Sequence, residues 1–181
     1  TFNLNPSSET YDILSKRTVF DLVEIDMKYN RNMDPTYLNE RYALDLFSRA
    51  GVHAQETTLV DLYVEIGETR HHYGLYTVFE PVDERFIERR FDLSDQGGDL
   101  YKSLWQHYGP AALTWPVTDG AIGIKDASEN YRPAYDLKTN KKTSTHADLI
   151  AFIHDLNTLE GDAFLDFLET RVDMTSLVRY F

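Results

Sequence analysis

The amino-acid sequence predicts an α+β protein. An antiparallel β-rich part comes first, over about residues 17–137, and a helical part follows, over about 145–181. Apolar and polar residues alternate over 23–29, two strand patterns joined by a Gly-containing turn cover 57–80, and helical patterns follow one another after residue 145. With 181 residues, of which 42% are hydrophobic, the chain is long enough to bury a core, and we expect residues 1–181 to form a single domain.

The first strand pattern, over 23–29, separates apolar from charged side chains. The apolar face carries Val23, Ile25, Met27 and Tyr29, and the opposite face carries Glu24, Asp26 and Lys28. The charged face is either solvated, as is usual for a half-buried strand, or lines a cleft in which Lys28 meets an anion.

A helix is predicted from residue 35 to Ala50. Asp34 and Pro35 are typical of a helix start, because an Asp side chain accepts a hydrogen bond from an unpaired N–H group and Pro has no N–H to leave unpaired. Gly51 is suited to the left-handed residue that ends a helix. The apolar residues recur at three- and four-residue steps: Leu38, Tyr42, Ala43, Leu46, Phe47 and Ala50. We expect this helix to lie across a hairpin formed by strands 57–66 and 70–80.

The second strand of that hairpin leads into the most informative stretch, residues 73–86. Gly74 to Phe79 is an aromatic and β-branched run suited to a buried strand, which should end near Glu80 because Pro81 cannot donate to a sheet ladder. Asp83 then caps a helix that reaches Phe91. This exit is either an ordinary connection between a strand and a helix or an edge where unpaired backbone groups meet a flat ligand such as a purine.

The second half of the chain contains shorter predicted elements. A loop with Gly97 and Gly98, which is either a turn or a place where backbone N–H groups approach a ligand, precedes a strand at 99–102. Strands at 121–124 and 134–137 are expected to form a second hairpin. The basic segment 138–145 is either a solvated loop or a site for a phosphate or carboxylate, and Ser144 or Thr145 is expected to cap the next helix. Two more helices follow, at 159–170 and after Asp173.

Composition excludes several classes of function. The chain has 30 acidic and 18 basic residues, so its net charge of −12 disfavours binding to nucleic acid or to an anionic membrane surface. It has no Cys, no apolar run of about 20 residues, and no basic and apolar signal-peptide pattern at its N-terminus. No Gly-x-Ser-x-Gly elbow, phosphate-binding Walker loop or dinucleotide fingerprint is present. The residues alone therefore predict an α+β domain and do not identify its ligand.

An ordered series of motifs resembles the CotH kinase family, the spore coat protein H type. The segment 32–52 is similar to a helix segment of that family. The segments 62–64, 72–76 and 80–83 resemble the family's hairpin. Further similar motifs are Asp99-Leu-Tyr-Lys102, Tyr135-Asp-Leu-Lys-Thr-Asn140 and residues 148–157. The resemblance covers the chain from about residue 22 onward.

This resemblance implies an atypical protein-kinase-like fold that binds ATP and a divalent metal, Mg, and that transfers phosphate to Ser residues of coat or surface proteins. It also implies export, to the spore surface or the extracellular space. Glu40 would steady a phosphate-gripping Lys. Lys28 is the only lysine on the preceding strand and is the candidate for that lysine. The hinge that meets adenine would be formed by Glu80, Pro81 and Val82. Lys102 and Lys138 would either contact phosphate or form structural ion pairs.

The family's catalytic Asp and metal-binding Asp are expected beyond the segment that matches 176–181. The chain therefore resembles the N-terminal and middle part of a CotH-type kinase, and by itself we expect it to hold a nucleotide without completing phosphoryl transfer. No residue of the chain is predicted to be catalytic or to bind metal. The alternatives are a non-catalytic surface or coat interaction protein with a CotH-like fold, and a polysaccharide-associated module suggested by the many Tyr residues.

Overall fold

The computed structural model describes residues 2–3, 24–29, 36–106, 108–126, 128 and 130–181. Contacts divide the chain into two compact units. Unit 1 comprises the residues up to Phe86 together with Tyr180, and unit 2 comprises Ile87–Arg179 together with Phe181. None of the described helices is long and apolar enough to cross a membrane.

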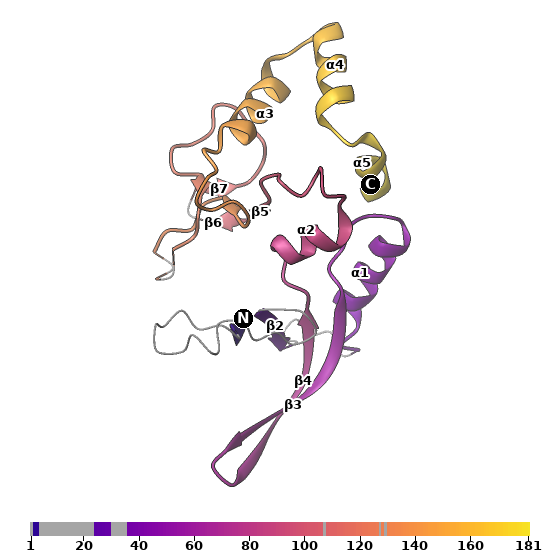
Figure 1. Cartoon of the computed structure of the whole chain (residues 1–181), viewed down its shortest axis with the longest axis vertical. Coiled ribbons are helices and arrows are strands. Elements are labelled where there is room, and N and C mark those ends of the chain that lie inside the picture. The colour runs from indigo at the N-terminus through magenta and orange to yellow at the C-terminus, as the bar shows by residue number, and fades with distance from the viewer. Residues whose placement is uncertain (1, 4–23, 30–35, 107, 127, 129) are drawn as a thin grey trace. The chain divides into compact units, whose positions relative to one another are not determined.

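Unit 1 is built on an antiparallel sheet with the strand order β1-β2-β4-β3. Its strands are β1 (Phe2–Asn3), β2 (Glu24–Tyr29), β3 (Thr57–Ile66) and β4 (Thr69–Phe79). The long hairpin of β3 and β4 is the most extended feature of Figure 1. The predicted bounds of β3 are confirmed, and β4 begins one residue earlier and ends one residue earlier than the predicted 70–80. Position 23 of the predicted first strand lies outside the described residues.

A bulge interrupts the hairpin register. Leu62 lies opposite Gly74, but the next residue of β3, Tyr63, lies opposite His72, so β4 has one extra residue at this point. Gly74 has a φ of 93°, a left-handed conformation that a side chain strains and that glycine adopts freely. The glycine in the predicted strand is therefore needed for a local change in backbone direction.

The helix α1 (Asn39–Arg49) begins later than the sequence predicts. Asp34 and Pro35 lie outside the described residues, and the described residues before Asn39 are not helical. Tyr37 has a φ of 59°, which is incompatible with a continuous right-handed helix through 36–38. The helix contacts β3, as expected, but it contains no buried residue, and three members of its predicted apolar face, Leu38, Tyr42 and Leu46, are 46%, 69% and 55% exposed.

Unit 2 contains a small mixed sheet with the strand order β5-β9-β8. Its strands are β5 (Tyr101–Ser103), β8 (Ile122–Gly123) and β9 (Tyr135–Leu137), and β6 (Trp105–Gln106) pairs separately with β7 (Gly109–Pro110). The predicted hairpin of 121–124 and 134–137 is wrong, because β8 and β9 pair in parallel and β9 pairs antiparallel with β5. The intervening chain is long enough to return beside the start of β8, and β9, now central, is buried along its whole length.

Three helices complete unit 2: α3 (Ala147–Thr158), α4 (Gly161–Arg171) and α5 (Met174–Tyr180). Ile153 of α3 is fully buried against Ala121, Ala134 and Tyr135, and Phe152 packs against Phe167 of α4 with 5.2 Å between the ring centroids. The predicted cap at Asp173 is confirmed, because its carboxylate accepts hydrogen bonds from the Thr175 and Ser176 N–H groups.

The predicted cap of α3 by Ser144 or Thr145 is wrong. His146 occupies the N-cap position with a φ of 62°, and its side chain does not cap the helix. The Ser144 hydroxyl is engaged by Asp99, on a distant part of the chain, and by the His146 N–H. A tertiary partner thus replaces the local capping interaction that the sequence suggests.

Candidate functional site

The exit of β4 is held by three hydrogen bonds to Glu80. The Glu80 N–H donates to the Glu56 carbonyl over 2.9 Å, and the Glu80 carbonyl accepts from Nε2 of Gln55 over 2.6 Å. The Glu56 N–H donates to Oε2 of Glu80 over 3.2 Å. Glu80 is only 4% exposed, so its side chain forms part of the packed interior of unit 1. We call Gln55, Glu56 and Glu80 the exit clasp.

The exit clasp is followed directly by a helix start. Pro81 is buried and Val82 is half-buried, and α2 (Glu84–Arg90) begins two residues after Val82. Asp83 caps this helix, as predicted, because its Oδ1 accepts from the Arg85 N–H over 2.9 Å and from the Phe86 N–H over 3.3 Å. Burial raises the pKa of Asp83 above its ordinary value, and the negative charges of Glu84 and Glu80 raise it further. The hydrogen bonds from the Phe86 and Arg85 N–H groups lower this pKa but do not offset the increase.

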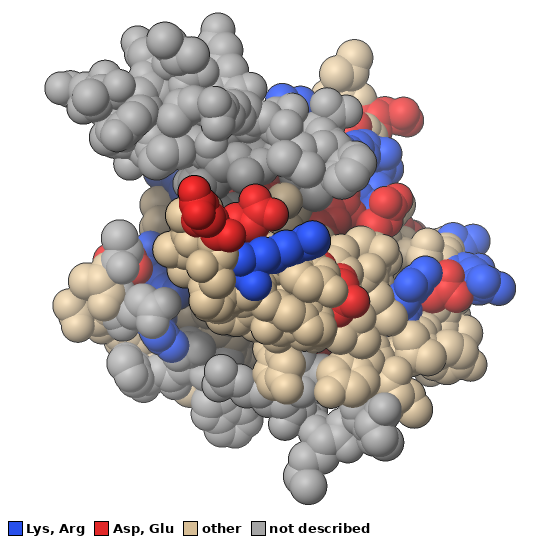
Figure 2. Space-filling model, turned by 90° about the horizontal axis from the view of Figure 1, so that it is seen from below, with Lys and Arg blue, Asp and Glu red and all other residues tan. Residues whose placement is uncertain are grey.

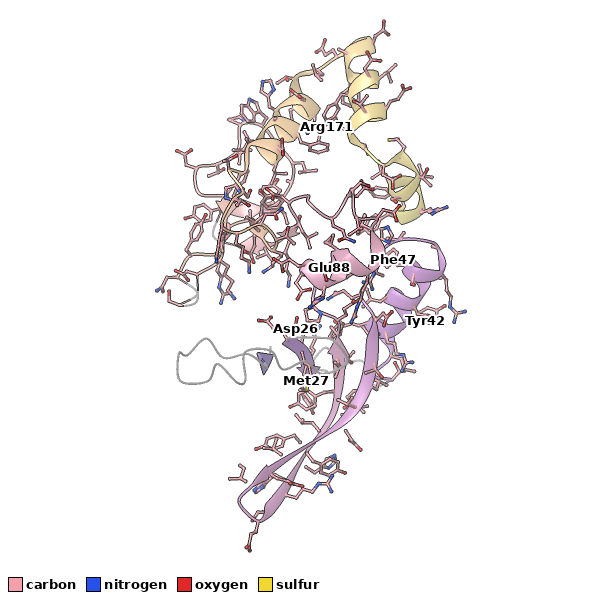
Figure 3. All side chains as sticks on the ribbon, viewed as in Figure 1. Asp26, Met27, Tyr42, Phe47, Glu88 and Arg171 are labelled. Carbon is pink, nitrogen blue, oxygen red and sulfur yellow. The ribbon has the colours of Figure 1, made fainter. Side chains whose placement is uncertain are left out.

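Lys28 and Glu40, predicted as site residues, form an ion pair between Lys28 Nζ and Glu40 Oε1. Lys28 is on β2, which pairs with β4 so that Lys28 lies opposite Thr77. Glu40 is in the first turn of α1. The neighbours Asp26 and Met27 on β2 are labelled in Figure 3, as are Tyr42 and Phe47 on α1. Both charged side chains are a little over 40% exposed, so solvent and ligands reach the pair.

The other predicted lysines lie in unit 2, on or beside neighbouring strands. Lys138 Nζ pairs with Oδ2 of Asp136, whose side chain is almost fully buried and whose Oδ1 accepts from the Lys125 N–H over 3.0 Å. Lys102 on β5 lies opposite Asp136 on β9 and is exposed. The sequence prediction missed Asp136, although an acidic residue within the apolar run from Ala134 to Leu137 is an unusual signal.

Two motifs of the sequence meet in unit 2 through a clamp formed by Thr139 and Asn140. Asn140 Nδ2 donates to the carbonyls of Gly97 and Gly98 over 2.9 and 3.1 Å and to Oδ1 of Asp99 over 3.0 Å. The Thr139 hydroxyl donates to the Gly98 carbonyl and accepts from the Leu100 N–H. Gly97 lies in a turn, and the carbonyl groups of Gly97 and Gly98 are occupied by protein donors; the alternative, a ligand at the N–H groups of this loop, stays a prediction.

Beside this clamp lies an open hollow with a volume of about 280 Å³. It is lined by Gly97, Asp99, Asn140, Thr143, Ser144, Thr145, His146, Ala147 and Asp148. The Tyr101 hydroxyl lies 2.8 Å from Nδ1 of His146 and 3.4 Å from Oδ2 of Asp99. Burial raises the pKa of Asp99, but hydrogen bonds from Ser144, Asn140 and Tyr101 outweigh it and hold that pKa below its ordinary value.

The charges of this hollow bear on the prediction for the basic segment 138–145. The hollow is lined by two carboxylates, and its lining does not include Lys141 or Lys142, which are exposed. A phosphate inside it would face Asp99 and Asp148, so its lining does not favour an anion. On the face of the molecule in Figure 2, Lys and Arg side chains lie next to Asp and Glu side chains.

The described residues contain no group of three or more His, Asp or Glu side chains that could hold a metal ion. A comparison with curated proteins gives no match. A model of the family described as CotH kinase protein matches residues 26–181, a range that includes every residue of the exit clasp, the Lys28–Glu40 pair and the Asn140 clamp. The chain therefore belongs to the CotH kinase family.

Proposed function

We propose that this chain is the ATP-binding part of a CotH-type protein serine kinase, and that ATP binds in unit 1. The observation that carries the proposal is the ion pair between Lys28 on β2 and Glu40 on α1. In protein kinases a strand lysine that contacts the nucleotide phosphates is held by a helix glutamate in this way. Chain order supports the same assignment, because the strand, the helix, the hairpin and the exit of β4 follow one another.

Lys28 has the chemistry that phosphate binding needs. An ammonium group has three N–H donors, and the contact with Glu40 occupies one direction, so further donors can reach phosphate oxygens. Glu40 limits the freedom of a long flexible side chain, which reduces the conformational entropy that Lys28 loses when it binds an anion. The pair is accessible, so a nucleotide need not displace packed side chains to reach it.

Lys102 and Lys138 fit different roles in the proposal. Lys138 is engaged by the buried Asp136, and this supports a structural ion pair. Lys102 is exposed on β5 of unit 2, and the proposal assigns it no contact with the ATP in unit 1. Adenine would meet the backbone at Glu80, Pro81 and Val82.

In nucleotide sites Mg is held by one or two carboxylates together with the phosphates and water, and the described residues contain no group of three or more His, Asp or Glu side chains. Nucleotide binding by this chain, rather than phosphoryl transfer, is therefore the activity that we propose to test. Ser residues of coat or surface proteins as phosphate acceptors, and export to the spore surface, are proposed from family membership alone.

The proposal is tested by measuring the Kd of ATP for the chain and for Lys28→Ala and Glu40→Gln. We expect binding to weaken about tenfold or more in Lys28→Ala, and less in Glu40→Gln, since the charge-assisted phosphate contact is lost only in the first. Arg49→Ala is the matched control, because it removes the exposed Arg49–Asp45 ion pair of the same helix and should leave the Kd unchanged. Unaltered binding in Lys28→Ala would refute the assignment of Lys28, and no ATP binding in the unaltered chain would favour the non-catalytic interaction protein.

A further inference from the structure

We propose that the free edge of β3 binds an extended, basic segment of a partner protein, which adds to the sheet of unit 1 as an antiparallel strand. This interaction is separate from nucleotide binding and does not depend on it. In the described sheet, β3 has a neighbouring strand, β4, on one side only. An edge strand presents backbone N–H and C=O groups with which another chain can pair, so this edge is open to strand addition.

The outer half of β3 lies in a two-stranded ribbon. The described residues of β2 pair with β4 only as far as Tyr29 opposite Tyr76, and the hairpin continues beyond this pair to its turn, as Figure 1 shows. β3 contains neither Lys nor Pro, the residues that commonly protect an edge against strand addition, and the extra residue of the bulge is on β4. The edge of β3 is therefore continuous up to Ile66.

The register of the hairpin identifies the backbone groups that point outward. A two-residue turn connects Ile66 with Thr69, so this closing pair exchanges hydrogen bonds, and every second residue of β3 from there points to β4. The Glu80 N–H to Glu56 carbonyl bond gives the same alternation from the other end of the strand. The outward residues in the outer half of β3 are therefore Asp61, Tyr63 and Glu65. Their outward backbone groups have no hydrogen-bond partner within the part of the chain that the structure describes.

Side chains of both strands hold this edge in an extended form. The rings of Tyr63 and His72 stack with 4.6 Å between their centroids, and the guanidinium carbon of Arg70 lies 4.1 Å from the centroid of the Tyr63 ring. Nε2 of His72 lies 3.1 Å from Oδ1 of Asp61. These cross-strand contacts order the ribbon before a partner binds, which reduces the entropy lost when a strand is added.

The side chains at the outward positions indicate the chemistry of the partner. Asp61, Tyr63 and Glu65 alternate along the strand, so they lie on one face, and all three are exposed. Directly opposite residues of paired strands have Cβ atoms about 4.5–5.5 Å apart, so Lys or Arg opposite Asp61 and Glu65 forms two pairs of opposite charge. We expect a partner segment with two basic residues four positions apart and an apolar or aromatic residue midway between them.

A second copy of the chain fits the same edge poorly. In an antiparallel pair centred on Tyr63, Asp61 of each copy would lie opposite Glu65 of the other. Like charges in directly opposite positions are destabilising, and each copy carries a net charge of −12. The charge pattern therefore favours a basic partner over self-pairing.

The test measures the binding of short peptides to the full chain by fluorescence anisotropy, at physiological ionic strength and without nucleotide. The first probe is the peptide Thr-Thr-Lys-Thr-Tyr-Thr-Lys-Thr-Thr, and the second has Glu in place of both Lys. We expect saturable binding of the Lys peptide and binding at least about tenfold weaker for the Glu peptide. No binding of the Lys peptide to the unaltered chain overturns the inference.

Peptides with methylated amide nitrogens distinguish strand addition from attraction by charge alone. In the antiparallel pair the amides of the two Lys point to β3, whereas those of the two Thr beside the Tyr point away. We expect methylation of the two Lys amides to weaken binding about tenfold or more, and methylation of those two Thr amides to change the Kd less than about twofold. Equal effects of the two methylations overturn the inference. This comparison uses the unaltered chain, so it does not depend on the folding of a variant.

A charge exchange locates the site on the chain. The double variant Asp61→Lys, Glu65→Lys should bind the Glu peptide more tightly than the Lys peptide, which reverses the preference of the unaltered chain. The double variant Asp166→Lys, Glu169→Lys on α4 makes the same change in net charge in unit 2 and should keep that preference. An unreversed preference in the first variant overturns the inference. A dimer in analytical ultracentrifugation that the first variant dissociates also overturns it, because a second copy then occupies the edge.

Discussion

Replacement of Asn140 should destabilise unit 2 through the loss of its clamp on the Gly97–Asp99 loop. The Asn140 side-chain nitrogen has three acceptors within 3.1 Å, but an amide nitrogen carries two hydrogens, so it makes at most two strong bonds at a time. At about 1 kcal/mol of net stabilisation per hydrogen bond, loss of the donor costs about 2 kcal/mol. Asn140→Asp loses this donor and also places a second carboxylate beside Asp99.

The backbone of Asn140 allows the side-chain and main-chain effects to be separated. Its φ of 50° is tolerated by Asn and Gly but strains Ala by about 1 kcal/mol. We therefore expect Asn140→Ala to lose about 3 kcal/mol and Asn140→Gly about 2 kcal/mol, because only the first adds strain to the lost hydrogen bonds.

Urea unfolding followed by tryptophan fluorescence measures these differences, because Trp105 and Trp115 both belong to unit 2. Asn130→Ala is the control, since Asn130 hydrogen-bonds to Ser128, two residues away on an exposed segment, and its effect should stay within about 0.5 kcal/mol. A wild-type free energy of unfolding in Asn140→Asp at pH 7 would show that the clamp does not stabilise unit 2. Equal values for Ala and Gly would refute the argument from backbone strain.

Two further predictions concern a carboxylate and a glycine. Because hydrogen bonds lower the pKa of Asp99 below 3.8 despite burial, its ionised form stabilises the folded state above pH 3.8, and this contribution is lost as the pH falls through the folded-state pKa. The difference in free energy of unfolding between the wild type and Asp99→Asn should therefore be constant from neutral pH down to about pH 5 and shrink below about pH 4; a difference that grows on acidification contradicts this. Gly74→Ala should destabilise the chain by about 1–2 kcal/mol through its φ of 93° alone, since no atom lies within 4 Å of the added Cβ. In Gly97→Ala the added Cβ also has no atom within 4 Å, and we expect the stability to be nearly unchanged when thermal unfolding is followed by circular dichroism. Equal losses of stability in the two variants would show that backbone strain is not the cause.

The elements that the sequence predicts well are those whose ends depend on neighbouring residues. The bounds of β3 follow from a run rich in β-branched and apolar residues, interrupted only by Asp61 and Glu65, that stops at the Gly67 turn. The caps at Asp83 and Asp173 use N–H groups only two and three residues ahead, so they are visible without knowledge of the tertiary structure.

The predictions that are wrong depend on contacts between distant residues. Ser144 is a residue type that commonly caps helices, but its hydroxyl donates a hydrogen bond to Asp99, which is 45 residues away in the sequence. The strands β8 and β9 are consecutive in the chain, as the two strands of a hairpin are, but β9 pairs antiparallel with β5, and β8 joins it in parallel on the other edge. A local pattern has no information about such competitors.

The candidate site shows the same division between local and distant information. Lys28 was predicted from a charged strand face and from family resemblance, and Glu40 from family resemblance. The two residues are 12 positions apart in the sequence, and positions 30–35 between them lie outside the described part of the chain. Gln55 has no such signal, because a single Gln before a strand is common. Asp136 has one, because an acidic residue in an apolar strand is costly to bury unless it is paired, and Lys138 two positions on is the nearest residue able to pair with it.

The Lys28–Glu40 pair is well suited to a functional test because it contributes little to stability. Both side chains are more than 40% exposed, and ion pairs of that kind typically stabilise a protein by about 0–1 kcal/mol. Helix α1 has no buried residue, so removal of either charge leaves no unpaired group in an apolar interior. A loss of ATP binding in Lys28→Ala with an unchanged melting temperature would therefore report on the lost ammonium group rather than on unfolding. The same reasoning does not extend to Asp136, whose carboxylate is 2% exposed, so a variant there would lower both stability and any activity.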